Sequence, residues 1–280
     1  MQSVAARRVL SLLCLAACAS TLVGCGGDTL SFDPVAQAAS ETAKTESARV
    51  EFTANMQVEG VGGMAMSGSG VFDGRARSGA MNMRFELPAG AAVQLGGGDP
   101  TMEMIMDGRD GLVMYMRSSL FKTIAGGKWV KLDMKKLAER QGFDPNTLMN
   151  ANQADPSQSL KMLMASSDAN VLGYDRVRGV FTTHYKLNVD LERLAKDDKT
   201  YRKMVDQLKQ ATGVTSYPAE AWIDDKDRVR RLKIDMSFNA PTGGAFTMSM
   251  TMELYAFGIK VDVPPPAAND VVDASALLGG

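Results

Sequence analysis

The sequence contains few of the residues that most enzymes and metalloproteins use for their chemistry. Its 280 residues include one histidine, His184, and three cysteines, Cys14, Cys18 and Cys25, all within the first 25 residues. Beyond residue 25 the chain therefore has no thiol, no disulfide and no basis for a structural zinc site. A catalytic triad or a histidine general base would have to use His184, which we expect to be a solvent-facing strand residue. We predict that the protein is not an enzyme and needs no metal or cofactor.

Neither sign of charge predominates, and long apolar runs are missing after the N-terminal region. Lys and Arg number 31 against 32 Asp and Glu, a net charge of −1 at pH 7. This balance gives no reason to expect binding to nucleic acid. No later segment is apolar for long enough to form a spanning helix. The acidic cluster Asp224–Asp227 lacks the ligand spacing of a calcium loop, so we predict a hairpin turn there.

The first 25 residues have the layout of a secretory signal. Arg7 and Arg8 precede a run over 9–21 that is apolar or small almost throughout, and this run is too short for a spanning helix. It ends in Leu22-Val23-Gly24-Cys25, which resembles the bacterial lipobox, where the cysteine is diacylated and becomes the new N-terminus. The alternative is an ordinary secretory signal with an incidental cysteine. We predict residues 1–24 as a lipoprotein signal peptide and residues 25–32 as a lipidated tether. Cys25 then anchors the protein to the cell membrane through a diacylglyceryl group, facing the extracytoplasmic side.

Alternation of apolar and polar residues predicts strands in the body of the chain. The clearest stretches are 50–58, 81–87, 102–106, 232–238 and 246–254. A period of two is typical of antiparallel strands with one buried and one solvated face.

Helical patterns are fewer than strand patterns. Asp33-Pro34 predicts the start of a helix that runs to about Ser47. The stretches 133–141, 157–165 and 190–211 also have helical spacing, and Gly213 follows the last of them. With no internal repeat and no second core, we predict a single α+β domain.

Methionine is abundant, with 20 residues, most of them on the apolar faces of the predicted strands. Met is flexible and fills irregular space, so it is a poor choice for a uniquely packed core. One interpretation is a Met-rich but otherwise ordinary core. The other is a curved sheet whose concave face lines a cavity for flexible acyl chains, with Gly60, Gly62, Gly63, Gly68 and Gly70 helping the second strand to bend. The lining residues that we predict are Phe52, Met56, Met81, Met83, Phe85, Met102, Met104, Met106, Met114, Met236, Phe238, Met248, Met250 and Met252.

Several segments, in the same order along the chain, resemble a known family. The stretch 115–118 followed by Lys128-Trp129-Val130-Lys131-Leu132-Asp133 is similar to a strand-helix-strand signature of LppX/LprG-type mycobacterial lipoproteins. Further similarities lie at 177–185, at Ala221-Trp222-Ile223-Asp224 with Arg230-Arg231, and at 255–264. The chain departs from the family in its high Met content and in the Gly-rich segment 89–99.

The resemblance implies a fold and a function. The expected fold is a strongly curved antiparallel sheet, or half-open β-barrel, with helices packed over its concave face, related to the LolA/LolB lipoprotein carriers. This domain would cover residues 33–263, followed by a C-terminal tail at 264–280. The expected function is to bind an acylated lipid or glycolipid and to carry or present it across the cell envelope, with a lipid transporter as a candidate partner. The alternative is an envelope adaptor or sensor that binds a membrane protein and keeps only a vestigial cavity.

Overall fold

The computed structural model describes residues 33–44, 47–60, 62–88, 100–109, 111–141, 160, 162–196, 199–239 and 244–274. The predicted signal peptide, Cys25 and the predicted tether lie outside the described residues. Asp33–Gly280 forms a compact unit by itself.

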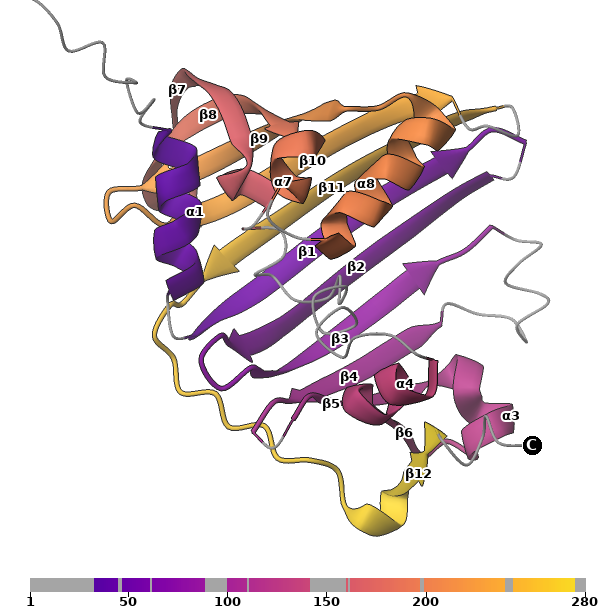
Figure 1. Ribbon diagram of the computed structural model, residues 1–280. Helices are drawn as coiled ribbons and strands as arrows, with labels where there is room; N and C mark the ends of the chain where they lie inside the picture. The colour runs from indigo at the N-terminus through magenta and orange to yellow at the C-terminus, as the bar shows by residue number, and fades with distance from the viewer. Residues whose placement is uncertain are drawn as a thin grey trace, which may run out of the picture. The chain divides into compact units, whose positions relative to one another are not determined.

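A single sheet of twelve strands dominates this unit, in the order β12-β6-β5-β4-β3-β2-β1-β11-β10-β9-β8-β7 (Figure 1). The strands are β1 Ser47–Val58, β2 Gly62–Asp73, β3 Ser78–Glu86, β4 Thr101–Asp107, β5 Val113–Ser118, β6 Trp129–Asp133, β7 Ser166–Val177, β8 Val180–Asp190, β9 Ser216–Asp224, β10 Val229–Asn239, β11 Ala245–Tyr255 and β12 Val271–Asp273. All neighbours pair antiparallel except β12 and β6, which are parallel. The predicted strands are all present.

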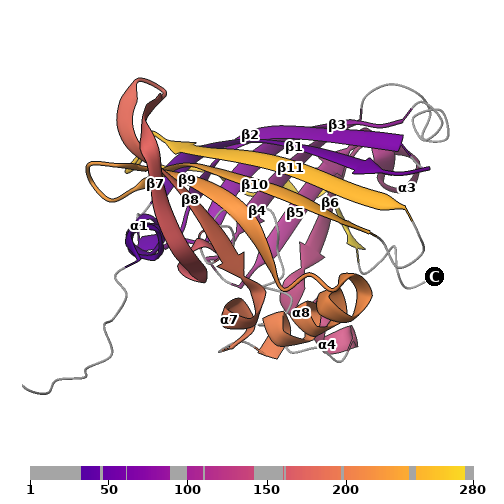
Figure 2. The same ribbon diagram turned by 90° about the horizontal axis from the view of Figure 1, so that it is seen from above.

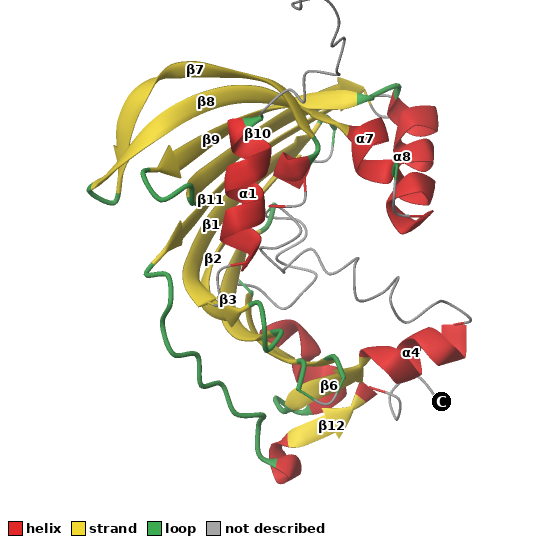
Figure 3. Cartoon of the chain, turned by 60° about the vertical axis from the view of Figure 1, so that its left-hand side comes forward, coloured by secondary structure: helices red, strands yellow, loops and turns green. Residues whose placement is uncertain are grey.

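The sheet is curved and does not close, because β12 and β7 occupy its two ends. Helices α1, α4, α7 and α8 lie on the inner side of the curve (Figures 2 and 3). The helices of the described residues are α1 Pro34–Lys44, α3 Lys122–Ala125, α4 Met134–Gln141, α7 Leu191–Ala195 and α8 Lys199–Thr212, with short 3₁₀ helices η1 Ser119–Phe121 and η2 Ala268–Asp270. The predicted fold, a strongly curved antiparallel sheet with helices over its concave face, is confirmed.

Helix α1 begins where the sequence predicts and packs against one end of the concave face. The Asp33 carboxylate accepts hydrogen bonds from the backbone N–H groups of Val35 and Ala36, at 2.9 and 3.1 Å. This N-cap satisfies groups that have no partner within the helix. Val35, Ala38 and Ala39 are fully buried against the sheet. The helix ends at Lys44, before the predicted Ser47, because Ser47 already belongs to β1.

The stretch predicted as one helix from Asp190 to residue 211 is two helices, α7 and α8, so this prediction was wrong. Asp190 ends β8 and caps α7, accepting hydrogen bonds from the N–H groups of Glu192 and Arg193. α7 ends at Ala195, and α8 starts at Lys199. The predicted end is confirmed: Gly213 has a φ of +73° and donates its N–H to Lys209 O at 2.8 Å.

The segment after residue 263 contributes to the sheet. β12 pairs with β6 through Val271 and Trp129, Val272 and Val130, and Asp273 and Lys131. Ala274 then packs with Ala125 and Val130 in a small core separate from the main one. The predicted helix at 157–165 lies only partly within the described residues, where Leu160 and Leu163 are fully buried.

Candidate functional site

Strand register places all of the predicted lining residues on one face of the sheet. Phe52 lies opposite Met252 and Gly68, and Met252 lies opposite Leu232. Because alternate residues of a strand point to the same side, this pairing fixes the face for β1, β2, β10 and β11. Gly68 in turn lies opposite Met83, and Met83 lies opposite Met102, so the same face extends across β3 and β4 to β5. We call this the inner face, since Val35, Ala38 and Ala39 of α1 pack on it.

Burial on the inner face decreases along the strands. Near α1, whose Thr42 hydroxyl accepts a hydrogen bond from Val229 N at 2.8 Å, the face is a packed core. Val50 and Leu254 are 1% exposed there, whereas Met56 and Met248, farther along the same strands, are half-buried. The predicted lining residues therefore divide into two groups. Met81, Met104, Met106, Met114 and Met252 are buried in the core.

The remaining predicted residues, together with Met64, Met66 and Phe246, form a half-buried, Met- and Phe-rich surface that we call the apolar band. It consists of Phe52, Met56, Met64, Met66, Met83, Phe85, Met102, Met236, Phe238, Phe246, Met248 and Met250. The Phe238 and Phe246 rings stack across β10 and β11 with centroids 4.7 Å apart. Large apolar side chains that are neither fully packed nor fully exposed suit a surface that is covered by something flexible.

Sequence reasoning missed Met64, Met66 and Phe246 as members of the band. Phe246 follows the clear alternation of its strand, which could have included it. Met64 and Met66 alternate with Gly63, Ala65 and Ser67, so both faces of β2 carry small residues and the usual contrast between faces is absent. The Met residues themselves are the signal that could have identified this strand.

An open groove of about 900 Å³ lies at the same end of the sheet but is lined largely by residues of the opposite, outer face. Its lining residues are Asn55, Met56, Gln57, Gly63, Met64, Ala65, Glu86, Leu87, Pro218, Asp235, Met236, Ser237, Thr247, Met248 and Ser249. By register, Asn55, Gln57, Ser237, Thr247 and Ser249 alternate with the Met residues and point to the outer face. The outer face thus offers polar groups where the inner face offers apolar ones.

His184 lies on the outer face of the sheet, as the sequence predicts, but it is half-buried and not fully exposed to solvent. Its side chain is 20% exposed, its Nε2 lies 2.7 Å from Glu220 Oε2, and its ring stacks on Trp222 with centroids 4.0 Å apart. Trp222 and Glu220 come from β9, so the sequence of β8 alone could not predict that they contact His184. Neither partner is a nucleophile, so the arrangement gives no support to a catalytic triad.

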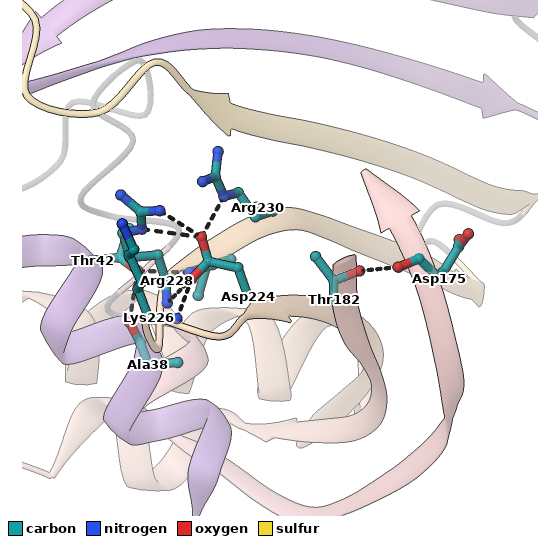
Figure 4. Close-up of polar contacts among 9 residues, drawn as sticks. Ala38, Thr42, Asp175, Thr182, Asp224, Lys226, Arg228 and Arg230 are labelled. Carbon is teal, nitrogen blue, oxygen red and sulfur yellow. Dashed lines mark hydrogen bonds and ion pairs between the residues drawn. The ribbon is translucent and has the colours of Figure 1, made fainter. Parts of the chain in front are cut away.

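The predicted hairpin turn around Asp224 is confirmed (Figure 4). Asp224 Oδ1 accepts hydrogen bonds from the backbone N–H groups of Lys226 and Arg228, each at 3.0 Å. Its Oδ2 accepts from Arg228 Nη2 at 2.9 Å and Arg230 Nε at 2.6 Å. Both guanidinium groups also lie over the Phe257 ring. The carboxylate is used entirely in closing the turn between β9 and β10.

Among the residues that the structure describes, no group of three or more His, Cys, Asp or Glu side chains is arranged to hold a metal ion. Within the same residues, no helix has the length and hydropathy needed to cross a membrane.

Comparison with known proteins gives one relative in sequence. No protein-family model matches the chain. An uncharacterized 31.2 kDa protein from the rplA–rplJ intergenic region of Streptomyces griseus is 29% identical over 249 residues, covering 86% of this chain and 78% of that protein.

Comparison of structures gives similar proteins of low identity. LprF from Mycobacterium bovis is 14% identical with a TM-score of 0.47, and covers 84% of this chain and 96% of that one. The Mycobacterium tuberculosis lipoprotein LppX is 13% identical with a TM-score of 0.37, covering 83% and 100%. A LolA superfamily protein from Nitrosomonas europaea is 8% identical with a TM-score of 0.26, covering 82% and 93%. Because these scores lie below 0.5, the fold assignment rests on the sheet itself. The chain is similar to LprF and LppX, proteins of the LppX/LprG type that its sequence segments resemble.

Proposed function

We propose that this chain is a membrane-anchored, extracytoplasmic lipoprotein that binds the acyl chain of a lipid or glycolipid on its apolar band. It would carry or present that lipid across the cell envelope. The observation that supports this most is the band itself, in which register brings Met and Phe side chains of β1, β2, β3, β4, β10 and β11 together on one half-buried face.

The chemistry of the band suits an acyl chain. Burying each CH₂ group of a ligand contributes roughly 0.8 kcal/mol, so a long chain gains affinity without polar recognition. Met side chains rotate about three bonds and adapt to different chain shapes. We therefore expect broad tolerance for chain length and unsaturation, and little discrimination by the band between headgroups.

Cys25 supplies the membrane attachment in this proposal. Its support is the sequence layout, with a basic start, an apolar run and Leu22-Val23-Gly24 before the cysteine. An anchor would hold the band near the bilayer from which its ligand comes.

Photo-cross-linking tests which face binds lipid. The chain would be incubated with a phosphatidylglycerol that carries a diazirine in one acyl chain, irradiated, and digested for mass spectrometry. We expect adducts on residues of the apolar band that do not line the outer groove, such as Met83, Met102 and Met250. Adducts confined to Ser237, Thr247 and Ser249 would place the lipid in the outer groove and contradict the proposal.

Two neighbouring residues of β11 provide matched variants. Met248 points to the inner face and Thr247 to the outer face of the same strand. Met248→Asp introduces a charge into the band, so we expect at least about a tenfold loss of affinity for a fluorescent fatty acid. Thr247→Asp adds the same charge on the exposed side and should leave affinity within about twofold. Equal effects of the two changes would contradict binding at the band.

A further inference from the structure

Four large apolar side chains are exposed together on the hairpin formed by β7 and β8. Val171 and Leu172 are each 55% exposed, Phe181 is 65% exposed and Tyr174 is 83% exposed. Among the described residues, Met164 at 41% is the other large apolar side chain that is exposed. We call Val171, Leu172, Tyr174 and Phe181 the hairpin patch. Its concentration in one element distinguishes it from the scattered apolar residues of an ordinary surface.

The backbone of β7 is irregular next to Val171 and Leu172. The β7–β8 register shifts between Ser167 and Asn170 and again between Val171 and Gly173. Asp168 and Gly173 have φ values of +56° and +155°. The second shift leaves Leu172 without a partner on β8, between Val171 opposite Tyr185 and Gly173 opposite His184. Past the bulge, Tyr174 lies opposite Thr183, which is on the same side of β8 as Tyr185 and Phe181, so Val171, Tyr174 and Phe181 share one side of the hairpin.

The hairpin is held firmly despite its exposed surface. Arg176 donates from Nη1 to Gly179 O at 2.7 Å, and its guanidinium lies 3.4 Å from the Phe181 ring centroid. At the turn, Arg178 pairs with Glu253 at 2.7 Å and with Glu51, and lies over the Tyr255 ring. Figure 2 shows the hairpin projecting at the β7 end of the sheet. These contacts attach the turn of the hairpin, next to Phe181, to β1 and β11.

The patch lies within reach of the predicted lipid anchor. The Ser166 hydroxyl, at the start of β7, donates a hydrogen bond to the Asp33 carboxylate at 2.8 Å. Tyr174 is eight residues along β7, about 26 Å at the rise of a strand. Cys25 is eight residues before Asp33, which allows a span of at most about 26–29 Å. A segment of this length is long enough for a lipid on Cys25 and the hairpin patch to meet one bilayer surface.

We propose that the hairpin patch inserts into the interface of the bilayer that holds the Cys25 anchor, forming a second point of membrane contact. This rests on the anchor in the proposed function. Tyr suits the boundary between water and acyl chains, because its ring is apolar and its hydroxyl is polar. Val171, Leu172 and Phe181 supply the apolar area that a shallow interfacial contact requires.

A fluorescence experiment tests this contact without depending on acylation. The chain from residue 25 onward, carrying Cys25→Ser and an N-terminal hexahistidine tag, would be held on phosphatidylcholine vesicles that contain nickel-chelating lipid. It has no thiol, since Cys14 and Cys18 precede it. Leu172→Cys would be labelled with bimane, and Asn82→Cys, exposed on β3 on the outer face, would serve as the control site. Phosphatidylcholine brominated in the upper acyl chain is the quencher.

We expect bimane at residue 172 to lose about half or more of its emission, because interfacial groups sit roughly 5–10 Å into the headgroup and acyl boundary. Bimane at residue 82 should be unchanged, and adding Tyr174→Ser and Phe181→Ser should abolish quenching at 172. No quenching at residue 172, or equal quenching at residues 172 and 82, would overturn the inference. The hairpin patch would then be a candidate binding surface for a protein partner. Photo-cross-linking of the apolar band measures lipid binding separately. Membrane contact by the hairpin patch can therefore be contradicted while lipid binding on the band is supported, and the reverse.

Discussion

Asp224 carries its charge with none of its side-chain surface exposed. Burial by itself raises the pKa of the Asp224 carboxyl, but hydrogen bonds from Arg228, Arg230 and the backbone N–H groups of Arg228 and Lys226 outweigh burial and hold the pKa below its usual value. A carboxyl with a lowered pKa in the folded state stabilises the protein above its unfolded pKa. That stabilisation is lost as pH falls through the folded pKa.

Asp224→Asn should therefore destabilise the protein in a pH-dependent way. At pH 7 we expect the free energy of unfolding to fall by about 3 kcal/mol, because two arginines lose a buried partner. Below about pH 4, the ordinary pKa of Asp, the difference from the parent should shrink. Urea unfolding between pH 3 and pH 7 measures this, with the exposed neighbour Asp225→Asn as the control. A difference that is constant with pH would contradict the role of the ionised carboxylate.

Trp222 offers a second prediction at the scale of one residue. It is 6% exposed, and its Nε1 is buried without a hydrogen-bond partner among the described residues. Trp222→Phe keeps an aromatic ring under His184 and removes the unpaired donor, so the free energy of unfolding should stay level or rise by up to about 1 kcal/mol. Trp222→Ala removes the ring as well and should lower it by about 3 kcal/mol. A similar large loss for both variants would mean that Nε1 is bonded.

At the scale of the element, the glycines on the inner face of β2 allow the backbone of a neighbouring strand to approach closely. A Cβ on Gly70 would lie 2.2 Å from Ala80 O, a backbone atom that cannot rotate away. Gly70→Ala should therefore destabilise the protein by about 2 kcal/mol or more, measured by thermal or urea unfolding. Ser69→Ala, at an exposed neighbouring position, should change stability by less than about 0.5 kcal/mol. Equal stability of the two variants would show that the sheet can move apart at Gly70.

The strands show what alternation can and cannot predict. β1, β10 and β11 alternate apolar and polar residues over most of their length, so their existence and inner faces follow from the sequence. Phe181 shares the alternation of Tyr185, Leu187 and Val189 on β8, yet it is 65% exposed whereas Leu187 and Val189 are buried. The reason is that Phe181 lies near the end of a hairpin at the sheet edge, where a side chain has few neighbours. The alternation of apolar and polar residues predicts which face of the sheet a residue lies on, whereas the tertiary structure determines which residues cover that face.

The contrast between local sequence signals and tertiary contacts also explains which helices and site residues could be predicted. Asp33-Pro34 is a local cap and predicts the start of α1, while the interruption between α7 and α8 leaves no break in helical spacing. The polar partner of His184, Glu220, comes from β9, so this contact depends on the register between strands, which no single segment contains. The apolar band could be predicted in part, because Met content is visible in the sequence, but its division from the core depends on where α1 packs.

At the scale of the whole molecule, the decrease in burial along the inner face predicts that its methionines have two roles. Met104 is 3% exposed, so Met104→Ala should lower the free energy of unfolding by about 2–5 kcal/mol. Met236 is half-buried, so Met236→Ala should cost less than about 1.5 kcal/mol and mainly weaken lipid binding. Urea unfolding and fatty-acid titration of both variants test this division. A larger loss of stability for Met236→Ala than for Met104→Ala would contradict it.

Native mass spectrometry of the protein purified from its own host tests lipid carriage most directly. The protein would be released from the membrane by cleavage of the tether and sprayed under gentle conditions without exposure to detergent. We predict a mass above that of the polypeptide, with the excess released as an acylated lipid on collisional activation, and a lower occupancy for Met248→Asp than for Thr247→Asp. A polypeptide mass without any adduct, from protein that remains folded, would contradict the proposal that this chain carries lipid.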